Sequence, residues 1–297
     1  MEESLGARSA DVNPRLREFT GESLSACALW RMLVPPMASA ASTMESQVLT
    51  DRSEGILTIT INRPQARNAM TGAAAQLIAD ALDELDADDA LRIAILTGAG
   101  GHFCSGMDLK GFLRGERPSV EGRGFGGVTR KSPHKPLIAA VEGYALAGGL
   151  EMVLACDLVV AASNSQFGVP EVKRGIVASE GGLLRLPRQL PYRIALELAL
   201  TGDFLSATRA YGYGLLNRLV EPGAALSEAR RLGQEISRNG PLALAATKRV
   251  MQESQDWTAA EMWDRQSPIT DPIFGTEDAI EGSAAFAEKR PPQWKGR

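Results

Sequence analysis

From residue 46 onward, short apolar runs alternate with longer amphipathic ones. Residues 56–64, ILTITINRP, alternate and are rich in β-branched side chains, which predicts a strand ended by the proline. Residues 92–100, RIAILTGAG, predict a buried strand that runs into a glycine turn. Between them, residues 72–90 predict a helix, because four apolar side chains recur at helical spacing: Leu77, Ile78, Leu82 and Leu85. Strand and helix alternate, which is typical of α/β domains.

The same order continues through the middle of the chain. Residues 136–146 repeat the strand-and-turn scheme, a helix is expected to begin near Gly148, and residues 158–162, LVVAA, predict another strand. Residues 121–135, EGRGFGGVTRKSPHK, are rich in glycine and charge, so we expect a mobile loop beside a site. After residue 190 the pattern is mostly helical, and no internal sequence repeat is visible.

The first 44 residues differ from the rest because they show no clear periodicity. Their start is acidic, unlike a transit peptide, and their apolar stretch is too interrupted for a signal sequence. We expect residues 1–44 to be a disordered extension, or sequence upstream of a later start at Met37 or Met44.

Composition narrows the class of protein and its partners. The 297 residues are 44% hydrophobic and 23% charged, which is ordinary for a globular chain. The formal net charge of −4 and the lack of a basic stripe argue against nucleic acid as a partner. Apolar runs are broken well short of a membrane span, so no membrane association is expected. The three cysteines are scattered at Cys27, Cys104 and Cys156, which favours a reducing compartment such as the cytoplasm.

The most informative segment is GYALAGGLEMVLACD, residues 143–157. Two glycines at the expected start of a helix are costly unless bare backbone is needed there. The first amides of a helix lack internal acceptors, so the Gly148 N–H could hold a developing oxyanion, with Glu151 facing the same pocket. The alternative is a tight strand-to-helix turn in which Glu151 only complements the helix dipole.

A second segment, GHFCSGMDLKGF at residues 101–112, has the same character. Small residues leave backbone exposed before an expected helix, and the Met107 N–H would be a second free donor, a partner for that of Gly148. The alternative is a loop in which Asp108 serves as a local helix cap.

A third segment, FGVPEVKRGIVASEGG at residues 167–182, carries Glu171. Two carboxylates in one dry pocket could hold a water between them, one taking its proton and the other delivering a proton to carbon. Like charges would push at least one carboxyl towards its protonated form near neutral pH. The alternative is an ordinary surface acid near Lys173 and Arg174.

Together these segments resemble the enoyl-CoA hydratase/isomerase (crotonase) superfamily over about residues 46 to 297. The stretches that match its pattern, in order, are INRPQARNAM, FCSGMDLK, KPLIAAVEGYALAGGLEMVLACDLVVAA, FGVPEVKRGI and ALTGDFLSATRAYGYGLLNRLV. The resemblance implies an α/β spiral of repeated ββα units at residues 45–240. It also implies a helical region at 241–297 that builds homotrimers, often paired as hexamers.

The resemblance also implies roles for individual residues. The backbone amides of Met107 and Gly148 would polarise a thioester carbonyl. Glu151 would help activate water for attack at Cβ, and Glu171 would supply the proton to Cα. The CoA adenine would lie along Ser105, Gly106, Met107, Asp108 and Leu109.

The C-terminal stretch AAFAEKR matches a family element. It implies that Phe286 and Lys289 reach the nucleotide of a neighbouring subunit. Simple packing of Phe286 and a solvated charge on Lys289 are the alternatives. The resemblance calls for no metal and no permanently bound cofactor, because coenzyme A enters as part of an acyl-CoA substrate. His102 and His134 are expected to be bystanders.

One stretch departs from the pattern of typical hydratases. Residues 178–187, ASEGGLLRLP, are more similar to carnitinyl-CoA dehydratase members, and Glu180 is the unusual residue. It would line the acyl pocket or complement a helix dipole. We therefore expect an enoyl-CoA hydratase. The alternatives are a carnitinyl-CoA dehydratase-like or double-bond isomerase activity on the same scaffold, and a non-catalytic acyl-CoA binder.

Overall fold

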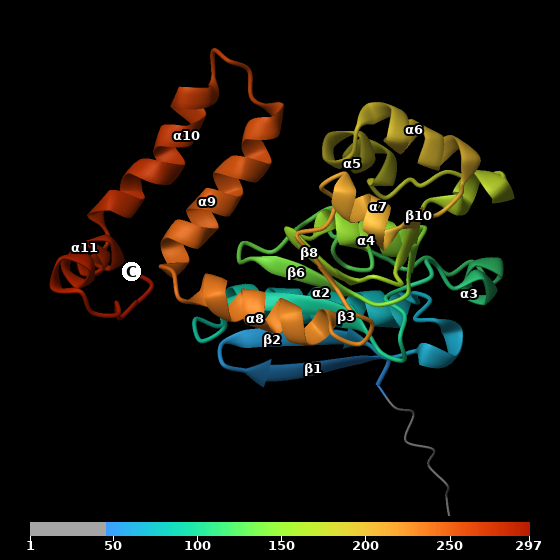
Figure 1. The fold of residues 1–297 in the computed structure, drawn as a ribbon, viewed down its shortest axis with the longest axis horizontal. Helices are drawn as coiled ribbons and strands as arrows, with labels where there is room; N and C mark the ends of the chain where they lie inside the picture. Colours follow the sequence, from blue (N-terminus) through green and yellow to red (C-terminus); the bar gives the residue numbers. More distant parts are fainter. Residues whose placement is uncertain (1–45) are drawn as a thin grey trace, which may run out of the picture. The chain divides into compact units, whose positions relative to one another are not determined.

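The structure is a computed structural model that describes residues 46–297. The extension expected at residues 1–44 lies outside the described residues. Figure 1 shows a strand-rich part followed by C-terminal helices. The larger sheet has the strand order β1-β2-β3-β6-β8-β11, antiparallel between β1 and β2 and parallel elsewhere. These strands are β1 (Val48–Ser53), β2 (Ile56–Ile61), β3 (Ile93–Gly98), β6 (Leu137–Val141), β8 (Leu158–Ala162) and β11 (Arg218–Val220).

A smaller sheet is ordered β10-β9-β7, and its strands β7 and β9 each follow a strand of the larger sheet. Its strands are β7 (Tyr144–Leu146), β9 (Gln166–Gly168) and β10 (Leu205–Ser206). The chain thus places one strand in each sheet and then turns into a helix, as in β6, β7 and α4 (Gly148–Ala155), or β8, β9 and the 3-10 helix η2 (Pro170–Arg174). This repeat confirms the predicted spiral of ββα units.

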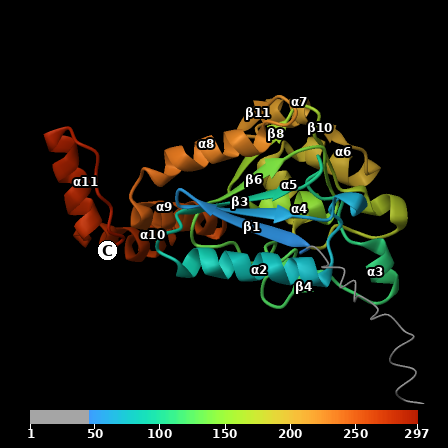
Figure 2. The ribbon, with the colours of Figure 1, turned by 90° about the horizontal axis from the view of Figure 1, so that it is seen from below.

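The larger sheet is buried on both faces, as a mainly parallel sheet requires. Figure 2 shows it between α2 (Gly72–Ala87) and α8 (Ala225–Ser237). One face packs with Ala225, Ala229 and Leu232 of α8, and the other packs with α2 and α4. Within α2, Ile78, Leu82 and Leu85 are buried, but Leu77 is 40% exposed. The predicted apolar stripe was therefore wrong for Leu77, which lies one 100° step round the helix from Ile78.

The glycine-rich segment at residues 121–135 is more deeply packed than a surface loop. The residues from Arg123 to Thr129 are buried, and the segment pairs β4 (Ser119–Val120) with β5 (Gly124–Phe125). Its expected position beside a site is confirmed below, because Phe125 lines the main cavity.

Helices dominate after residue 190, as predicted. The remaining elements are η1 (Pro64–Ala66), α3 (Leu109–Leu113), α5 (Gly182–Gln189), α6 (Tyr192–Thr201), α7 (Ala207–Gly212), α9 (Pro241–Glu253), η3 (Ser254–Asp256), α10 (Met262–Thr270), η4 (Asp271–Gly275) and α11 (Glu277–Glu288). No helix within residues 46–297 combines the length and the apolar character needed to cross a bilayer.

Candidate active site

Two backbone segments run side by side next to the main cavity. Residue 104 extends the smaller sheet beside β7, because the Cys104 N–H donates to Tyr144 O at 2.9 Å and the Leu146 N–H donates to Cys104 O at 3.0 Å. Met107 and Gly148 follow these two segments, and both line the same cavity. The structure therefore brings together the two amides that the sequence singled out.

Gly106 allows this close approach. Its φ of +98° lies in the left-handed region, and an added Cβ would stand 2.8 Å from Ala147 Cβ and 3.6 Å from Gly148 N. A side chain at this position would wedge the two segments apart. The bare backbone at Gly106 is thus a packing requirement of the site.

Helix α4 begins from a strained turn. Ala147, its N-cap residue, has φ 54° and ψ −129°, which is rare for a residue with a Cβ. Its N–H donates to Gly168 O at 2.8 Å, and its carbonyl accepts from Leu150 and Glu151. The amides of Gly148 and Met107 donate to no acceptor within residues 46–297. Two free N–H donors therefore belong to residues that line one cavity.

The glycine pair that opens α4 is also explained by contacts. A Cβ on Gly148 would lie 2.4 Å from Phe125 Cζ, and one on Gly149 would lie 2.2 Å from Cys104 O. The ring of Phe125 thus packs against Gly148, and Gly149 lets the helix lie close to residue 104. Neither position has room for alanine without a shift.

The cavity itself has a volume of about 660 Å³. Its walls are mostly apolar and aromatic, which suits a small-molecule site with a few convergent polar groups. The apolar part includes Met107, Leu109, Phe112, Phe125, Leu146, Ile176, Val177 and Phe204, and the carboxylates are Glu151, Glu171 and Glu180.

Sheet register explains why two of these carboxylates meet. Strands β7 and β9 are parallel neighbours, with Leu146 opposite Gly168. The segments that follow them, α4 and η2, therefore leave the sheet next to each other. Glu151 lies in the first turn of α4 and Glu171 lies in the first turn of η2, so both side chains reach the cavity. The sequence alone could not place them together.

Glu151 is firmly held. The residue is 3% exposed, and its Oε1 accepts from the N–H groups of Glu180 at 2.8 Å and Gly182 at 2.9 Å. Burial raises the pKa of this carboxyl, the two amide hydrogen bonds oppose that rise, and the nearby charge of Glu180 adds to it.

Glu171 is buried with less support. The residue is 7% exposed, and its Oε2 has no hydrogen-bond partner in the described part of the chain. Burial raises the pKa of Glu171 to about 7, and the charge of Glu151 contributes to the rise. A carboxyl in this condition can hold or release a proton near neutral pH.

Glu180 lies just before α5 and lines the cavity, as one of the two sequence interpretations expected. Its carboxylate accepts from the Phe125 N–H at 3.2 Å and from both Nε and Nη2 of Arg130, at 3.1 and 3.2 Å. The side chain therefore contacts the buried segment at 121–135.

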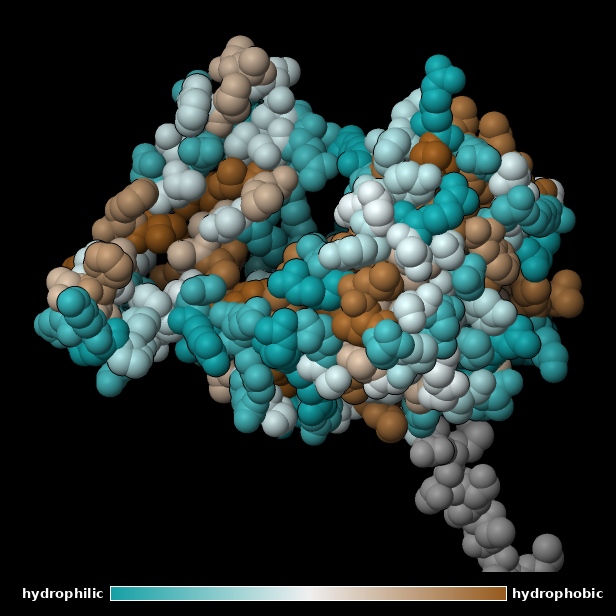
Figure 3. Space-filling view, in the orientation of Figure 1, coloured by the Kyte–Doolittle hydropathy of each residue, from teal (hydrophilic) through white to brown (hydrophobic). Residues whose placement is uncertain are grey.

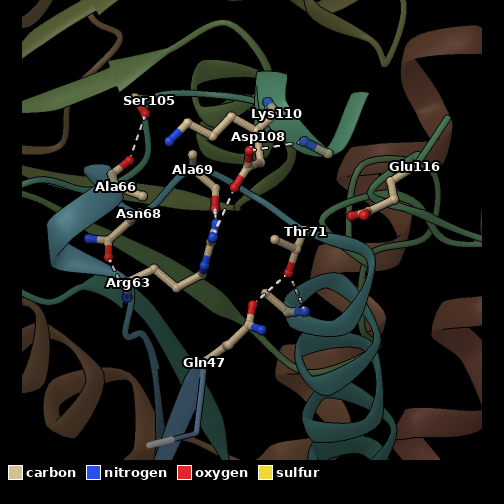
Figure 4. A network of polar contacts seen from close by, with 12 residues as sticks. Gln47, Arg63, Ala66, Asn68, Ala69, Thr71, Ser105, Asp108, Lys110 and Glu116 are labelled. Carbon is tan, nitrogen blue, oxygen red and sulfur yellow. Dashed lines mark hydrogen bonds and ion pairs between the residues drawn. The ribbon is translucent and has the colours of Figure 1, made fainter. Parts of the chain in front are cut away.

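Residues 105–109, which were predicted to lie along CoA, lie partly in the cavity lining and partly outside it. Ser105, Met107 and Leu109 line the cavity, and Gly106 is buried behind them. Asp108 does not line it. Figure 4 shows the Asp108 carboxylate directed at Arg63, with Asp108 Oδ2 and Arg63 Nη2 2.8 Å apart. Asp108 Oδ1 caps α3 through the amides of Lys110 and Gly111, so the alternative capping role is confirmed.

Two predicted residues lie away from the cavity. Phe286, at 87% exposure, and Lys289, the C-cap of α11, are not among its lining residues. Figures 1 and 2 place α11 and α3 at opposite ends of the described structure. Contact of these residues with a nucleotide bound in a neighbouring subunit stays a prediction.

The two histidines also lie outside the cavity lining. The ring of His102 stacks on Tyr144 at a centroid distance of 4.8 Å, and its Nδ1 accepts from the Tyr144 N–H. The His134 N–H donates to Asp86. Tyr144 lines the cavity, with the Arg67 guanidinium 5.7 Å from its ring centroid. His102 therefore supports a cavity wall from behind.

Sequence reasoning missed Phe125, Tyr144 and Arg67 as parts of the cavity wall. One signal was available for Phe125: three glycines surround it, and Gly124, Gly126 and Gly127 all have positive φ. Such a cluster indicates a backbone bent to place one side chain. Nothing in the sequence signals the pairing of Arg67 with Tyr144.

Comparisons with known proteins agree with this geometry. Residues 51–297 match the sequence profile of the enoyl-CoA hydratase/isomerase family. A curated relative, the carnitinyl-CoA dehydratase of Salmonella arizonae, is 40% identical over 264 residues, covering 85% of this chain and all of the relative.

Solved structures are similar over the same length. An enoyl-CoA hydratase from Mycobacterium marinum is 59% identical, with a TM-score of 0.84, and the match covers 85% of this chain and 100% of that one. A carnitinyl-CoA dehydratase from Mycobacterium avium is 43% identical with the same coverage and a TM-score of 0.69.

Proposed function

The chain belongs to the enoyl-CoA hydratase/isomerase (crotonase) family, and on that premise we propose that it is an enoyl-CoA hydratase. It adds water reversibly across the 2,3-double bond of an enoyl-CoA thioester. One observation carries the proposal: two free backbone amides and two buried glutamates face one cavity. Coenzyme A takes part as a portion of the substrate.

The amides of Met107 and Gly148 polarise the thioester carbonyl. Negative charge moves onto that oxygen as water adds to Cβ, and fixed N–H donors stabilise it without reorganising. The geometry favours these donors because neither has another acceptor in the described residues. The enolate that forms is held until a proton reaches Cα.

The two glutamates divide the proton transfers. Glu151 accepts a proton from the attacking water, since its carboxylate is fixed by two amides. Glu171 delivers a proton to Cα, since its pKa, raised to about 7, leaves about half of the carboxyl protonated at neutral pH. After one turnover the proton has moved from Glu171 to Glu151, and exchange with water restores the starting state.

The carnitinyl-CoA dehydratase-like reaction is the second candidate. Relatives that carry this name are 38–43% identical to the chain, whereas a solved structure named as an enoyl-CoA hydratase is 59% identical. Glu180 in the cavity wall is the feature that favours the second candidate. An isomerase often works with one carboxylate, so the retained pair disfavours it. A non-catalytic acyl-CoA binder would have no need of either glutamate.

The test is the hydration of crotonyl-CoA, followed by the loss of enoyl-thioester absorbance, for wild type and Glu171→Gln. We expect turnover by wild type and a loss of at least ~100-fold in the variant, the usual lower size of general acid–base catalysis. The control is Glu221→Gln, an exposed acid away from the cavity, which should leave the rate unchanged.

Absence of turnover by a folded wild type that binds CoA would overturn the hydratase proposal. Dehydration of carnitinyl-CoA by the same protein would then support the second candidate. Binding without any turnover of either substrate would support the acyl-CoA binder. Turnover that survives Glu171→Gln would contradict the role of that residue while leaving the hydratase activity in place.

We further propose that the chain forms homotrimers, alone or paired as hexamers. The C-terminal helices expose large apolar side chains, and Figure 3 shows hydrophobic surface over α9 and α10. Those more than half exposed are Met251, Trp263, Phe274, Ile280 and Phe286. In such an assembly Phe286 and Lys289 would reach the CoA nucleotide of a neighbour. The molar mass from light scattering tests the assembly, and a monomer would contradict it.

A further inference from the structure

Glu180 makes contacts in two directions from one position. Its main-chain N–H donates to Glu151 Oε1 at 2.8 Å. Its carboxylate accepts from the Phe125 N–H and forms a two-point ion pair with Arg130. The Glu180 side chain is 17% exposed and that of Arg130 is 63% exposed, so the carboxylate is largely buried while its partner is open to solvent.

The contact with Phe125 reaches the other half of the site. The Phe125 ring packs so closely on Gly148 that a Cβ there would lie 2.4 Å from it. Arg185 of α5 fastens the same segment, since its Nη2 donates to Thr129 O at 2.6 Å. Glu180 therefore contacts both Glu151 and the segment whose Phe125 packs against Gly148.

We infer that Glu180 is a positioning residue, resting on the proposed function: it fixes Glu151 through its amide and the Phe125 wall through its carboxylate. In addition, its negative charge, offset by Arg130, sets the electrostatic surroundings of Glu151. Glu180 need not touch the reacting atoms in this role. Glu180, the residue that departs from the pattern of typical hydratases, would then affect the reaction without contacting the reacting atoms.

The charges around Glu151 make this role testable. Glu180 and Arg185 face it from the segment at α5, and Glu171 faces it from η2. Glu180 pushes the pKa of Glu151 up and Arg185 pushes it down. Removing the charge of Glu180 should therefore lower the pKa of Glu151. Removing the Arg130 guanidinium should raise the pKa of Glu151, because no positive charge then offsets the Glu180 carboxylate.

A simple ion pair would behave differently. If Glu180 and Arg130 only fastened the segment at 121–135, removing either partner would loosen the same contact. Glu180→Gln and Arg130→Met would then move every property in the same direction. Loss of the contact between Glu180 and Arg130 would shift the pKa of Glu151 in the same direction in both variants. Shifts of opposite sign therefore distinguish an electrostatic role of Glu180 from a simple ion pair.

The experiment measures the pKa of Glu151 by ¹³C NMR in protein labelled at the glutamate carboxyl carbons. The Glu151 resonance is assigned by its disappearance in Glu151→Gln. We expect Glu180→Gln to lower the pKa of Glu151 by about half a pH unit and Arg130→Met to raise it by about the same amount. This is the size expected for the removal of one nearby charge. Arg188→Met, which breaks an exposed ion pair between α5 and Asp256 of η3, is the control and should shift nothing.

Shifts of the same sign in both variants, or no shift in either, would overturn the inference. The NMR titration does not depend on turnover. A wild type without hydratase activity would therefore overturn the proposed function and leave this result readable. A wild type that hydrates crotonyl-CoA, with no opposite shifts, would overturn only the role of Glu180. In active protein, the pH profile of kcat/KM should move with the NMR midpoint.

Discussion

Helix α4 and the 3-10 helix η2 each bring one glutamate to the cavity, but they hold it differently. Every residue of α4 is buried, and the Glu151 carboxylate accepts two amide hydrogen bonds. Beyond Glu171 the chain is exposed through the rest of η2 and on to Val177, which is 62% exposed, and Glu171 Oε2 has no hydrogen-bond partner in the described residues. The first carboxyl is fixed in place, whereas the second is left unpaired where a substrate proton could pass.

The difference suggests that the two roles are set by surroundings and not by residue type. Both side chains are glutamates in first turns, and both have a raised pKa. Hydrogen bonds to the charged form restrain the rise at Glu151, while Glu171 lacks comparable support at its second oxygen. Three experiments test this difference between the surroundings of the two glutamates.

The largest effect should come from Gly148, the first residue of the helix that carries Glu151. Gly148→Ala keeps the amide and adds a Cβ against Phe125, whereas Gly148→Pro adds similar bulk and removes the N–H. We expect Gly148→Pro to lose a further ~100- to 1000-fold in kcat relative to Gly148→Ala, the usual cost of one oxyanion donor. The measurement is steady-state hydration with crotonyl-CoA.

Gly212→Ala is the matched control for the added methyl group, because nothing lies within 4 Å of its Cβ position. Thermal unfolding of each variant would separate lost folding from lost catalysis. Equal rates for the alanine and proline variants would show that the Gly148 amide is not an oxyanion donor.

The next effect concerns pH. Hydration consumes no net proton, and in both directions the active state carries one proton shared between the two glutamates. Because Glu171 has a pKa of about 7, we expect kcat/KM to fall about tenfold per pH unit above that value as the pair loses its last proton. The fall should be the same for hydration and for dehydration, measured on the enoyl and hydroxyacyl thioesters. A flat profile to pH 9 would contradict the raised pKa.

The smallest effect should appear in stability. The pKa of Glu171 rises on folding from its ordinary 4.5 to about 7, so the folded state binds this proton more tightly than the unfolded state. Its stabilising contribution is complete below about pH 4.5 and is lost as pH rises through about 7. Glu171→Gln cannot ionise and should escape this loss.

The Tm of Glu171→Gln relative to wild type should therefore rise between pH 5 and pH 8, by about 2–4 °C for each kcal/mol of linkage. Glu221→Gln should run parallel to wild type over the same range. A Glu171→Gln curve that is also parallel would mean that Glu171 titrates normally in the folded protein.

Much of the fold could be predicted from periodicity, since β8 occupies the predicted residues 158–162 and α4 begins at Gly148, where a helix start was predicted. The segments that carry the two free amides could also be predicted, because glycines mark where backbone must be bare. The strained Ala147 could not, since alanine carries no signal for positive φ. Its conformation depends on the contact with Gly168, which lies on another strand.

The pairing of Glu151 with Glu171 shows the same limit. It follows from the parallel register of β7 and β9, and that register is a tertiary contact between separate repeats of the spiral. The packing of Phe125 on Gly148 and of His102 on Tyr144 likewise joins distant segments. Local patterns identified these stretches as unusual, but not which of them would meet.

The two free amides come from neighbouring backbone segments beside the smaller sheet, while Ile176 and Val177 line the cavity from the separate segment that follows η2. Phe125, by contrast, packs on Gly148, and the Glu180 N–H holds Glu151. The cavity is therefore modular only at Ile176 and Val177. On the proposed function, a library that varies these two positions alone should yield altered acyl preference at little cost to the shared chemistry of the thioester.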